Sequence, residues 1–258
     1  MKKMLVLLAG QSNMSGRGYL TEEDVKVIPG ITALRRDGVW IPAADPFNYD
    51  RINALGLNNS TDPFEEKALD VDGKRRCGVG PGRTFAKLLK ELFPEREIGL
   101  VPISIGGTPI ASWLPGGKDL HSEMMPYDDG IRLARKAQED GEFAVILWHQ
   151  GETDGKLQTQ NYLETLKTVI NNFRRDLNIP EVPVILGGLG DFLESRWSGK
   201  AYTQMIIQAA QELDNAGYVS AEGLTDRGDN LHFDTPSQYE FGRRYFAEYC
   251  KLAGIKTA

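Results

Sequence analysis

The chain has 258 residues, of which 41% are hydrophobic and 26% are charged. This length suits one large domain or two small ones, and it can bury a sizeable core without disulfides. The formal net charge is -6 and there is no long basic run, so nucleic acid is not expected as a partner. No apolar stretch reaches the roughly 18–20 residues of a membrane-spanning helix, so no membrane partner is expected either.

The N-terminus resembles the start of a signal peptide, because Met1-Lys2-Lys3 precedes an apolar run over residues 4–9. The run is at the lower length limit for such a peptide, and no clear cleavage site follows it. We interpret the run as a buried first strand and expect a cytoplasmic protein. The two cysteines, Cys77 and Cys250, are far apart in sequence and are expected to be reduced structural thiols.

Apolar runs with little alternation predict strands that are buried on both faces of a parallel sheet. They cover residues 4–9, 98–105, 143–148 and 182–189, with a weaker fifth run at 218–221. Helical patterns lie between the runs, at residues 81–93, 128–140, 162–177, 201–215 and 237–252. This alternation predicts an α/β fold over residues 1–258 as one domain: a three-layer α/β/α sandwich whose central parallel sheet has about five strands in flavodoxin-like order.

One long stretch, residues 16–79, shows no clear periodicity and is rich in Gly, Pro, Asn and Asp. Loops of this length inside a compact domain are usually functional or poorly ordered. Because the stretch follows the first strand, it is expected at the carboxyl edge of the sheet, where open α/β folds bind ligands.

The first candidate site residue is Ser12, in Gly10-Gln11-Ser12-Asn13-Met14. A strand ends, a glycine permits a tight turn, and the serine follows at the expected start of a helix. This places a hydroxyl at the carboxyl edge of the sheet beside free backbone N–H groups, as an acyl-transfer nucleophile requires. The alternative is that Ser12 only caps the helix.

A serine nucleophile needs a base, and the chain has three histidines: His121, His149 and His232. His232 follows Asp229 by three residues in a polar turn before the last helix. That spacing lets the carboxylate bind Nδ1 of the imidazole while Nε2 faces Ser12, and it would raise the pKa of His232. The alternative for a lone histidine in a polar loop is simple solvent exposure.

Two further strand ends supply candidate oxyanion donors. Gly107 follows the second strand within Ile105-Gly106-Gly107-Thr108 and can offer its backbone N–H at close approach. Gln150 follows the third strand within His149-Gln150-Gly151-Glu152 and carries a side-chain amide. With the Ser12 amide, three donors are expected to converge on one point.

Taken in chain order, the four blocks at residues 10–14, 106–107, 149–152 and 229–232 resemble the successive blocks of an SGNH hydrolase. More narrowly, they are similar to the sialate O-acetylesterase and family 6 carbohydrate esterase (acetylxylan esterase-like) branch, over residues 4 to about 246. The resemblance implies Ser12 as nucleophile, His232 as base and Asp229 as its orienting acid. It also implies Ser12, Gly107 and Gln150 as the oxyanion donors, with Gln150 in place of the asparagine of the wider superfamily.

Other polar and aromatic residues have less certain assignments. His149 and Glu152 are expected to position the Gln150 loop, with Glu152 left open as an alternative acid partner of His232. Their spacing could also suit a metal, but they lie at a strand end, and neither a metal nor another cofactor is expected. Trp113 and Trp197 follow strand ends and are candidate sugar contacts, with loop packing as the alternative for both.

The sequence thus predicts a serine esterase that removes O-acetyl groups from a carbohydrate partner, such as acetylated xylo-oligosaccharides or sialic acids. Two alternatives stay open: an esterase or thioesterase for a non-carbohydrate acyl group, and a non-catalytic carbohydrate-binding protein on the same fold. The oligomeric state and the acetylated position are not indicated by any residue.

Overall fold

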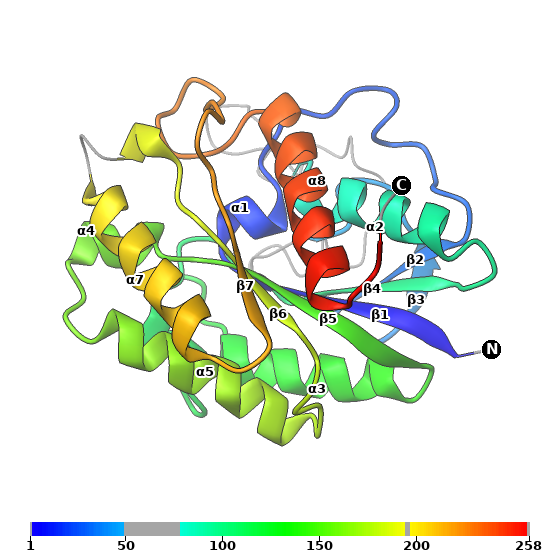
Figure 1. Cartoon of the computed structure of the whole chain (residues 1–258), viewed down its shortest axis with the longest axis horizontal. Helices are drawn as coiled ribbons and strands as arrows, with labels where there is room; N and C mark the ends of the chain where they lie inside the picture. The colour runs from blue at the N-terminus through cyan, green and yellow to red at the C-terminus, as the bar shows by residue number, and fades with distance from the viewer. Residues whose placement is uncertain (1, 49–77, 194–196, 257–258) are drawn as a thin grey trace.

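The computed structural model describes residues 2–48, 78–193 and 197–256. Its centre is a seven-stranded sheet with the order β3-β2-β4-β1-β5-β6-β7 (Figure 1). The strands are β1 (Lys3–Gly10), β2 (Ile31–Leu34), β3 (Trp40–Pro42), β4 (Ile98–Pro102), β5 (Gly141–His149), β6 (Val184–Gly187) and β7 (Ala216–Val219). Every neighbouring pair is parallel except β2 and β3, which are antiparallel.

The expected α/β class is confirmed, and each of the five predicted strands is present. The order of these five, β4-β1-β5-β6-β7, is the flavodoxin-like order. The expected number of strands was wrong, because β2 and β3 extend the sheet beyond β4. Both strands come from the stretch that was expected to be loop, where they are only four and three residues long.

Helices cover both faces of the sheet (Figure 1). They are α1 (Ser12–Ser15), α2 (Pro81–Leu92), α3 (Pro126–Gln138), α4 (Glu152–Leu157), α5 (Tyr162–Asp176), α7 (Gly199–Glu212) and α8 (Thr235–Leu252). Helices α2 and α8 pack on one face, and α3, α5 and α7 on the other. The five longer helices match the predicted ones, whereas the short α1 and α4 follow strand ends beside the site described below.

Strand β1 joins the two cores because alternate side chains of a strand point to opposite faces. Leu5 and Leu7 pack with the α3–α5–α7 side, while Val6 and Leu8 pack with the α2–α8 side. All four side chains are fully buried, which explains the unbroken apolar run in the sequence.

The carboxyl ends of β1 and β5 approach each other closely at Gly10. This residue has a φ of 125°, and a Cβ atom there would lie 2.0 Å from the carbonyl oxygen of His149. Only glycine fits such a position, so the turn from β1 into α1 is fixed by the sequence.

Cys250 is a free, buried thiol on α8, whereas Cys77 lies outside the described residues. Within the described ranges, no helix has both the length and the apolar character to cross a membrane.

Candidate active site

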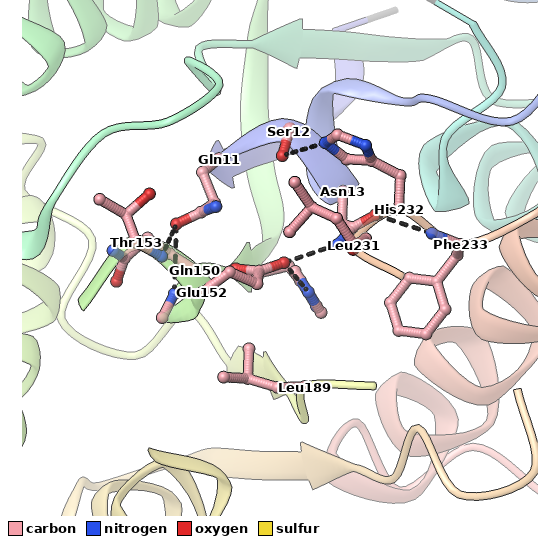
Figure 2. Close-up of polar contacts among 12 residues, drawn as sticks. Gln11, Ser12, Asn13, Gln150, Glu152, Thr153, Leu189, Leu231, His232 and Phe233 are labelled. Carbon is pink, nitrogen blue, oxygen red and sulfur yellow. Dashed lines mark hydrogen bonds and ion pairs between the residues drawn. The ribbon is translucent and has the colours of Figure 1, made fainter. Parts of the chain in front are cut away.

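Ser12 lies at the first position of α1, directly after the turn at Gly10. The N-cap position of α1 is occupied by Gln11, and no side chain caps this helix. The hydroxyl of Ser12 instead lies 3.1 Å from Nε2 of His232, 220 residues further along the chain (Figure 2). The side chain is buried, with 5% of its residue surface exposed, and it lines a cavity.

His232 lies in a turn before α8 that is stabilised by its own backbone contacts. The carbonyl of His232 accepts a hydrogen bond of 2.9 Å from the backbone N–H of Arg227, and an isolated bridge joins Asp226 to Phe233. Nδ1 of His232 lies 2.7 Å from Oδ2 of Asp229. The structure therefore brings Ser12, His232 and Asp229 into one hydrogen-bonded chain.

Asp229 is also fixed by bonds that do not involve the imidazole. Its Oδ1 accepts from the backbone N–H groups of Leu231 at 3.0 Å and His232 at 2.8 Å. Its Oδ2 accepts from Nε of Arg227 at 2.8 Å. Partial burial alone would raise the pKa of Asp229, but the hydrogen bonds from His232 and Arg227 outweigh it and hold that pKa well below its ordinary value.

The competing carboxylates have other partners. Asp226 accepts from the backbone N–H groups of Gly228 at 2.7 Å and Asn230 at 2.8 Å, and so shapes the turn. Asp234 caps α8 by accepting from the N–H of Ser237 at 2.8 Å. Asp229 is the carboxylate placed against the imidazole, with Oδ2 2.7 Å from Nδ1 of His232.

The pKa of His232 lies below its ordinary value, contrary to the expected increase. Burial is the main cause, since it disfavours the charged imidazolium. The hydrogen bond that the imidazole donates to Asp229 raises the pKa, but the positive charges of Arg17 and Arg227 lower it further. An imidazole in this setting is neutral near pH 7 and free to accept a proton.

Asn13 connects the first strand end to the turn that carries His232 (Figure 2). Its side-chain nitrogen donates to Oε1 of Glu152 at 2.6 Å and to the carbonyl of Leu231 at 3.2 Å. Its side-chain oxygen accepts from the backbone N–H of Phe233 at 3.1 Å. Asn13 therefore holds the residues on both sides of His232.

His149 and Glu152 hold the side chain of Asn13 in place. Both side chains are almost completely buried, and Nε2 of His149 lies 3.1 Å from Oε1 of Glu152. Burial alone would raise the pKa of Glu152, but the contacts with His149 and Asn13 lower it. We expected these two residues to position the Gln150 loop. Glu152 instead contacts Asn13, which in turn contacts the turn that carries His232.

The cavity beside Ser12 has a volume of about 410 Å³. The residues that line it are Gln11, Ser12, Arg17, Gly107, His121, Thr153, Lys156, Trp197, Arg227, Leu231 and His232. Gly107 has a φ of 78°, in the region that favours glycine. The lining contains several basic side chains and, within the described residues, no carboxylate.

Gln150 is placed differently from the expectation. Its side chain is fully buried and does not line the cavity. Its amide nitrogen donates to the carbonyl of Thr108 at 3.1 Å and to the carboxylate of Asp154. Two acceptors face this nitrogen, so a flipped amide would place the Gln150 oxygen against two other oxygens. The orientation of the amide is therefore defined.

The two candidate sugar-stacking residues are placed differently from each other. Trp197 lines the cavity, and Nζ of Lys156 lies 5.7 Å from the centre of its ring. Trp113 is fully buried in the short 3-10 helix Ile110–Trp113, in edge contact with Trp148, and its indole N–H donates to Thr108. The expectation that Trp113 borders the site was wrong, because its ring points into the core.

Sequence reasoning assigned no role to several residues that the structure brings to the site. Gln11, Arg17, His121, Lys156 and Arg227 all line the cavity. Gln11 and Arg17 flank the Ser12 block and Arg227 precedes Asp229 by two residues, so proximity in sequence was the available signal. No comparable signal exists for His121 or Lys156.

Across residues 2–48, 78–193 and 197–256, no three His, Cys, Asp or Glu side chains are grouped so as to hold a metal ion. His149 and Glu152, considered as a possible metal pair, are hydrogen-bonded to each other.

Comparisons with known proteins concern the family and the fold of the chain. The family described as "Carbohydrate esterase, sialic acid-specific acetylesterase" matches residues 2–251. A probable carbohydrate esterase of Arabidopsis thaliana is 30% identical over 268 residues, covering 95% of this chain and 91% of the plant protein. The crystal structure of that plant protein matches with a TM-score of 0.74 and 27% identity, covering 97% and 99% of the two chains.

Two more distant solved structures share the fold. The crystal structure of NanS has a TM-score of 0.72 at 17% identity and covers 98% of each chain. A carbohydrate acetylesterase from Xanthomonas citri has a TM-score of 0.68 at 16% identity and covers 99% of this chain and 57% of that one.

Proposed function

Because this chain belongs to the carbohydrate esterase, sialic acid-specific acetylesterase family, we propose that it removes O-acetyl groups from carbohydrates through an acyl-enzyme on Ser12. The observation that carries the proposal is the chain of hydrogen bonds from Ser12 to His232 to Asp229 at the wall of a cavity. Nucleophile, base and orienting acid in this order are the arrangement of a serine hydrolase.

In the first half of the reaction, Oγ of Ser12 attacks the acetyl carbonyl carbon while its proton passes to Nε2 of His232. The resulting oxyanion is stabilised by N–H donors at the cavity wall, among them the amides of Ser12 and Gly107. When this intermediate collapses, the bond from the acetyl carbon to the sugar oxygen breaks. His232 returns its proton to that oxygen, and the deacetylated sugar leaves.

In the second half, His232 takes a proton from water, and the water oxygen attacks the acetyl carbon bound to Ser12. The second intermediate collapses with cleavage of the bond to Oγ, which regains its proton from His232. Acetate and free Ser12 result. Asp229 keeps the imidazole in one tautomer and stabilises the imidazolium in both halves.

Among acetylated sugars, the basic cavity lining favours one that carries a carboxylate. Arg17, Lys156 and Arg227 line the cavity, and Lys156 is exposed beside Trp197. Opposite charges attract across such a cavity wall, whereas a neutral xylo-oligosaccharide lacks this charge attraction. We therefore propose an O-acetylated acidic sugar of the sialic acid class as the preferred substrate.

The test is acetate release from O-acetylated sialic acid and from acetylated xylo-oligosaccharide, measured side by side with the intact protein. The acidic substrate is expected to have the higher kcat/KM, and this advantage should shrink as salt screens the charges. Lys156→Met should reduce the ratio of the two kcat/KM values, while Lys251→Met on α8 should leave it unchanged. A preference for the neutral substrate would contradict the choice of sugar.

The acyl-enzyme itself is tested with Ser12→Ala and with mass spectrometry. Rapidly quenched wild-type protein should gain the mass of one acetyl group on the peptide that contains Ser12. Ser12→Ala should lose several powers of ten in turnover while it keeps its melting temperature. Binding of the sugars without acetate release by the wild type would instead indicate a non-catalytic binding protein, and faster cleavage of a thioester would indicate a thioesterase.

A further inference from the structure

We infer that Arg227 binds the carboxylate of an acidic sugar while it also holds Asp229, so that the charge on the substrate acts on the catalytic base. The inference rests on the proposed function, since it concerns how an acidic acetylated sugar is recognised. It goes beyond a general attraction between a basic cavity and an anion, because it assigns the contact to one guanidinium and links that contact to proton transfer.

The first support is the position of Arg227 between the triad and the cavity. Its Nε donates to Oδ2 of Asp229 at 2.8 Å, and the same oxygen lies 2.7 Å from Nδ1 of His232. Arg227 also lines the cavity together with Ser12 and His232. One carboxylate oxygen therefore joins the imidazole of the base to a guanidinium at the cavity wall.

The second support is the fixed orientation of this guanidinium. Only 9% of the Arg227 side chain is exposed. Its Nη1 donates to the carbonyl of Arg17 at 3.0 Å, and its Cζ lies 5.5 Å from the centre of the Tyr19 ring. Because these contacts fix the planar group before a substrate arrives, little conformational entropy is lost when an anion binds.

The third support is the set of donors that is left over. Among the residues that the structure describes, none accepts a hydrogen bond from Nη2 of Arg227. A guanidinium carries several N–H donors in one plane, and a nearly buried one with unused donors is well suited to a carboxylate. No carboxylate of the described chain lines this cavity, so a bound anion meets no competing acidic side chain there.

The spacing also suits a single sugar. Arg227 is separated from Oγ of Ser12 by three hydrogen bonds and the width of one imidazole ring. A monosaccharide is roughly this long, so one molecule can present its acetyl ester to Ser12 and its carboxylate to Arg227. Lys156, another cation of the cavity, lies over the ring of Trp197.

Binding of the carboxylate has an electrostatic consequence for His232. The charged or titratable groups on its turn and along the cavity are Asp229, Arg227, Arg17, Lys156 and His121. The positive charges of Arg17 and Arg227 lower the pKa of His232. A carboxylate on Arg227 offsets one of these charges and so raises that pKa within the complex. The base is therefore stronger when an acidic sugar is bound.

The test uses two substrates that differ only at the acid group: an O-acetylated sialic acid and its carboxamide. The wild type is expected to release acetate from the acid with a kcat/KM about 10–100-fold higher, as expected for one hydrogen bond between charged groups. Arg227→Gln should remove most of this ratio. Arg243→Gln, at an exposed arginine of α8, is the matched control and should keep the wild-type ratio.

Two further readouts separate the contact from folding. In the wild type, the midpoint of the pH profile of kcat, which reports the complex, should be higher for the acid than for the carboxamide. In Arg227→Gln the two midpoints should coincide. In calorimetry, Ser12→Ala protein should bind N-acetylneuraminic acid more tightly than its carboxamide, and adding Arg227→Gln should remove most of that difference. The binding measurement needs no turnover.

Two results would overturn the inference. One is an Arg227→Gln protein whose kcat/KM falls by the same factor on the acid and on the carboxamide, since Arg227 would then only hold Asp229. The other is a wild type whose kcat midpoints are equal for the two substrates, since the bound charge would then not reach His232. Failure of the proposed function is distinct from both, because the wild type would then release acetate from neither substrate.

Discussion

Asn13 and Glu152 are joined by a hydrogen bond of 2.6 Å between buried side chains that are 139 residues apart. Through this bond the block after β5 reaches the turn that holds His232, because Asn13 also contacts Leu231 and Phe233. Glu152 thus acts on His232 through Asn13, and not as a direct partner of the imidazole.

Glu152→Ala is expected to destabilise the protein, because the buried donors of Asn13 and His149 would lose their acceptor. An unsatisfied buried group costs about 1–3 kcal/mol. In a protein of this size, each kcal/mol lowers the melting temperature by about 2–4 °C. Calorimetry should show this decrease, while Glu164→Ala on the exposed face of α5 should show almost none. An unchanged melting temperature would remove Glu152 from the support of the site.

Asp229→Asn is expected to lower turnover by at least about 100-fold, because the amide favours the wrong tautomer of His232. Glu152→Gln should cost less, since its remaining oxygen can still accept from Asn13. Asp226→Asn and Asp234→Asn are the matched controls, and their smaller effects should appear in the melting temperature. Severe loss in Glu152→Gln beside a mild loss in Asp229→Asn would instead make Glu152 the orienting acid.

The pH profile of kcat/KM should rise through the pKa of His232, because the base must be neutral to accept a proton. Burial and the charges of Arg17 and Arg227 lower this pKa from 6.5, so the midpoint should lie below 6.5 and the plateau should be reached by neutral pH. Arg17→Gln removes a nearby positive charge and should move the midpoint to higher pH. Asp229→Asn removes a negative charge and should move the midpoint of the residual activity to lower pH.

A midpoint above 6.5 in the wild type would contradict the environment of His232. A midpoint that fails to move in either variant would show that another group controls the profile.

The two tryptophans are expected to respond in opposite ways. Trp197→Ala removes an aromatic wall of the cavity and should raise KM for a sugar ester by about 2–10-fold, the loss of roughly 0.5–1.5 kcal/mol of ring contact. Trp113→Ala opens a hole in the core and should cost about 3–5 kcal/mol of stability. Steady-state kinetics and thermal unfolding of both variants separate the two roles. An unchanged KM in folded Trp197→Ala would exclude ring stacking on the substrate.

Much of the fold could be predicted because the central strands are buried on both faces. Strands such as β1 and β5 then appear as continuous apolar runs. The edge strands β2 and β3 carry no such signal, since β3 is half-exposed and both are short. Strand β2 pairs with β4, which lies more than 60 residues further along the chain, and β3 pairs with β2. Local sequence contains no information on the pairing of β2 with β4.

The candidate site was predictable where the chemistry is local. Asp229 and His232 share one turn, and Ser12 comes two residues after Gly10, which marks the tight turn from β1 into α1. The orientation of an amide is not local, because Gln11 and Gln150 both follow strand ends and differ only in which acceptors surround them. Trp113 was misplaced for the same reason: a ring after a turn can face either the cavity or the core.

The hydrogen bond between Ser12 and His232 joins the end of β1 to the turn before α8. During synthesis, Ser12 is therefore present long before its base, and the sheet around β1 must wait for β4 and β5 to emerge. A nascent chain cannot cleave an ester until residue 232 has left the ribosome and its turn has docked on Asn13. Onset of hydrolysis thus reports arrival of the C-terminal turn, so timing acetate release during translation would follow the last steps of folding.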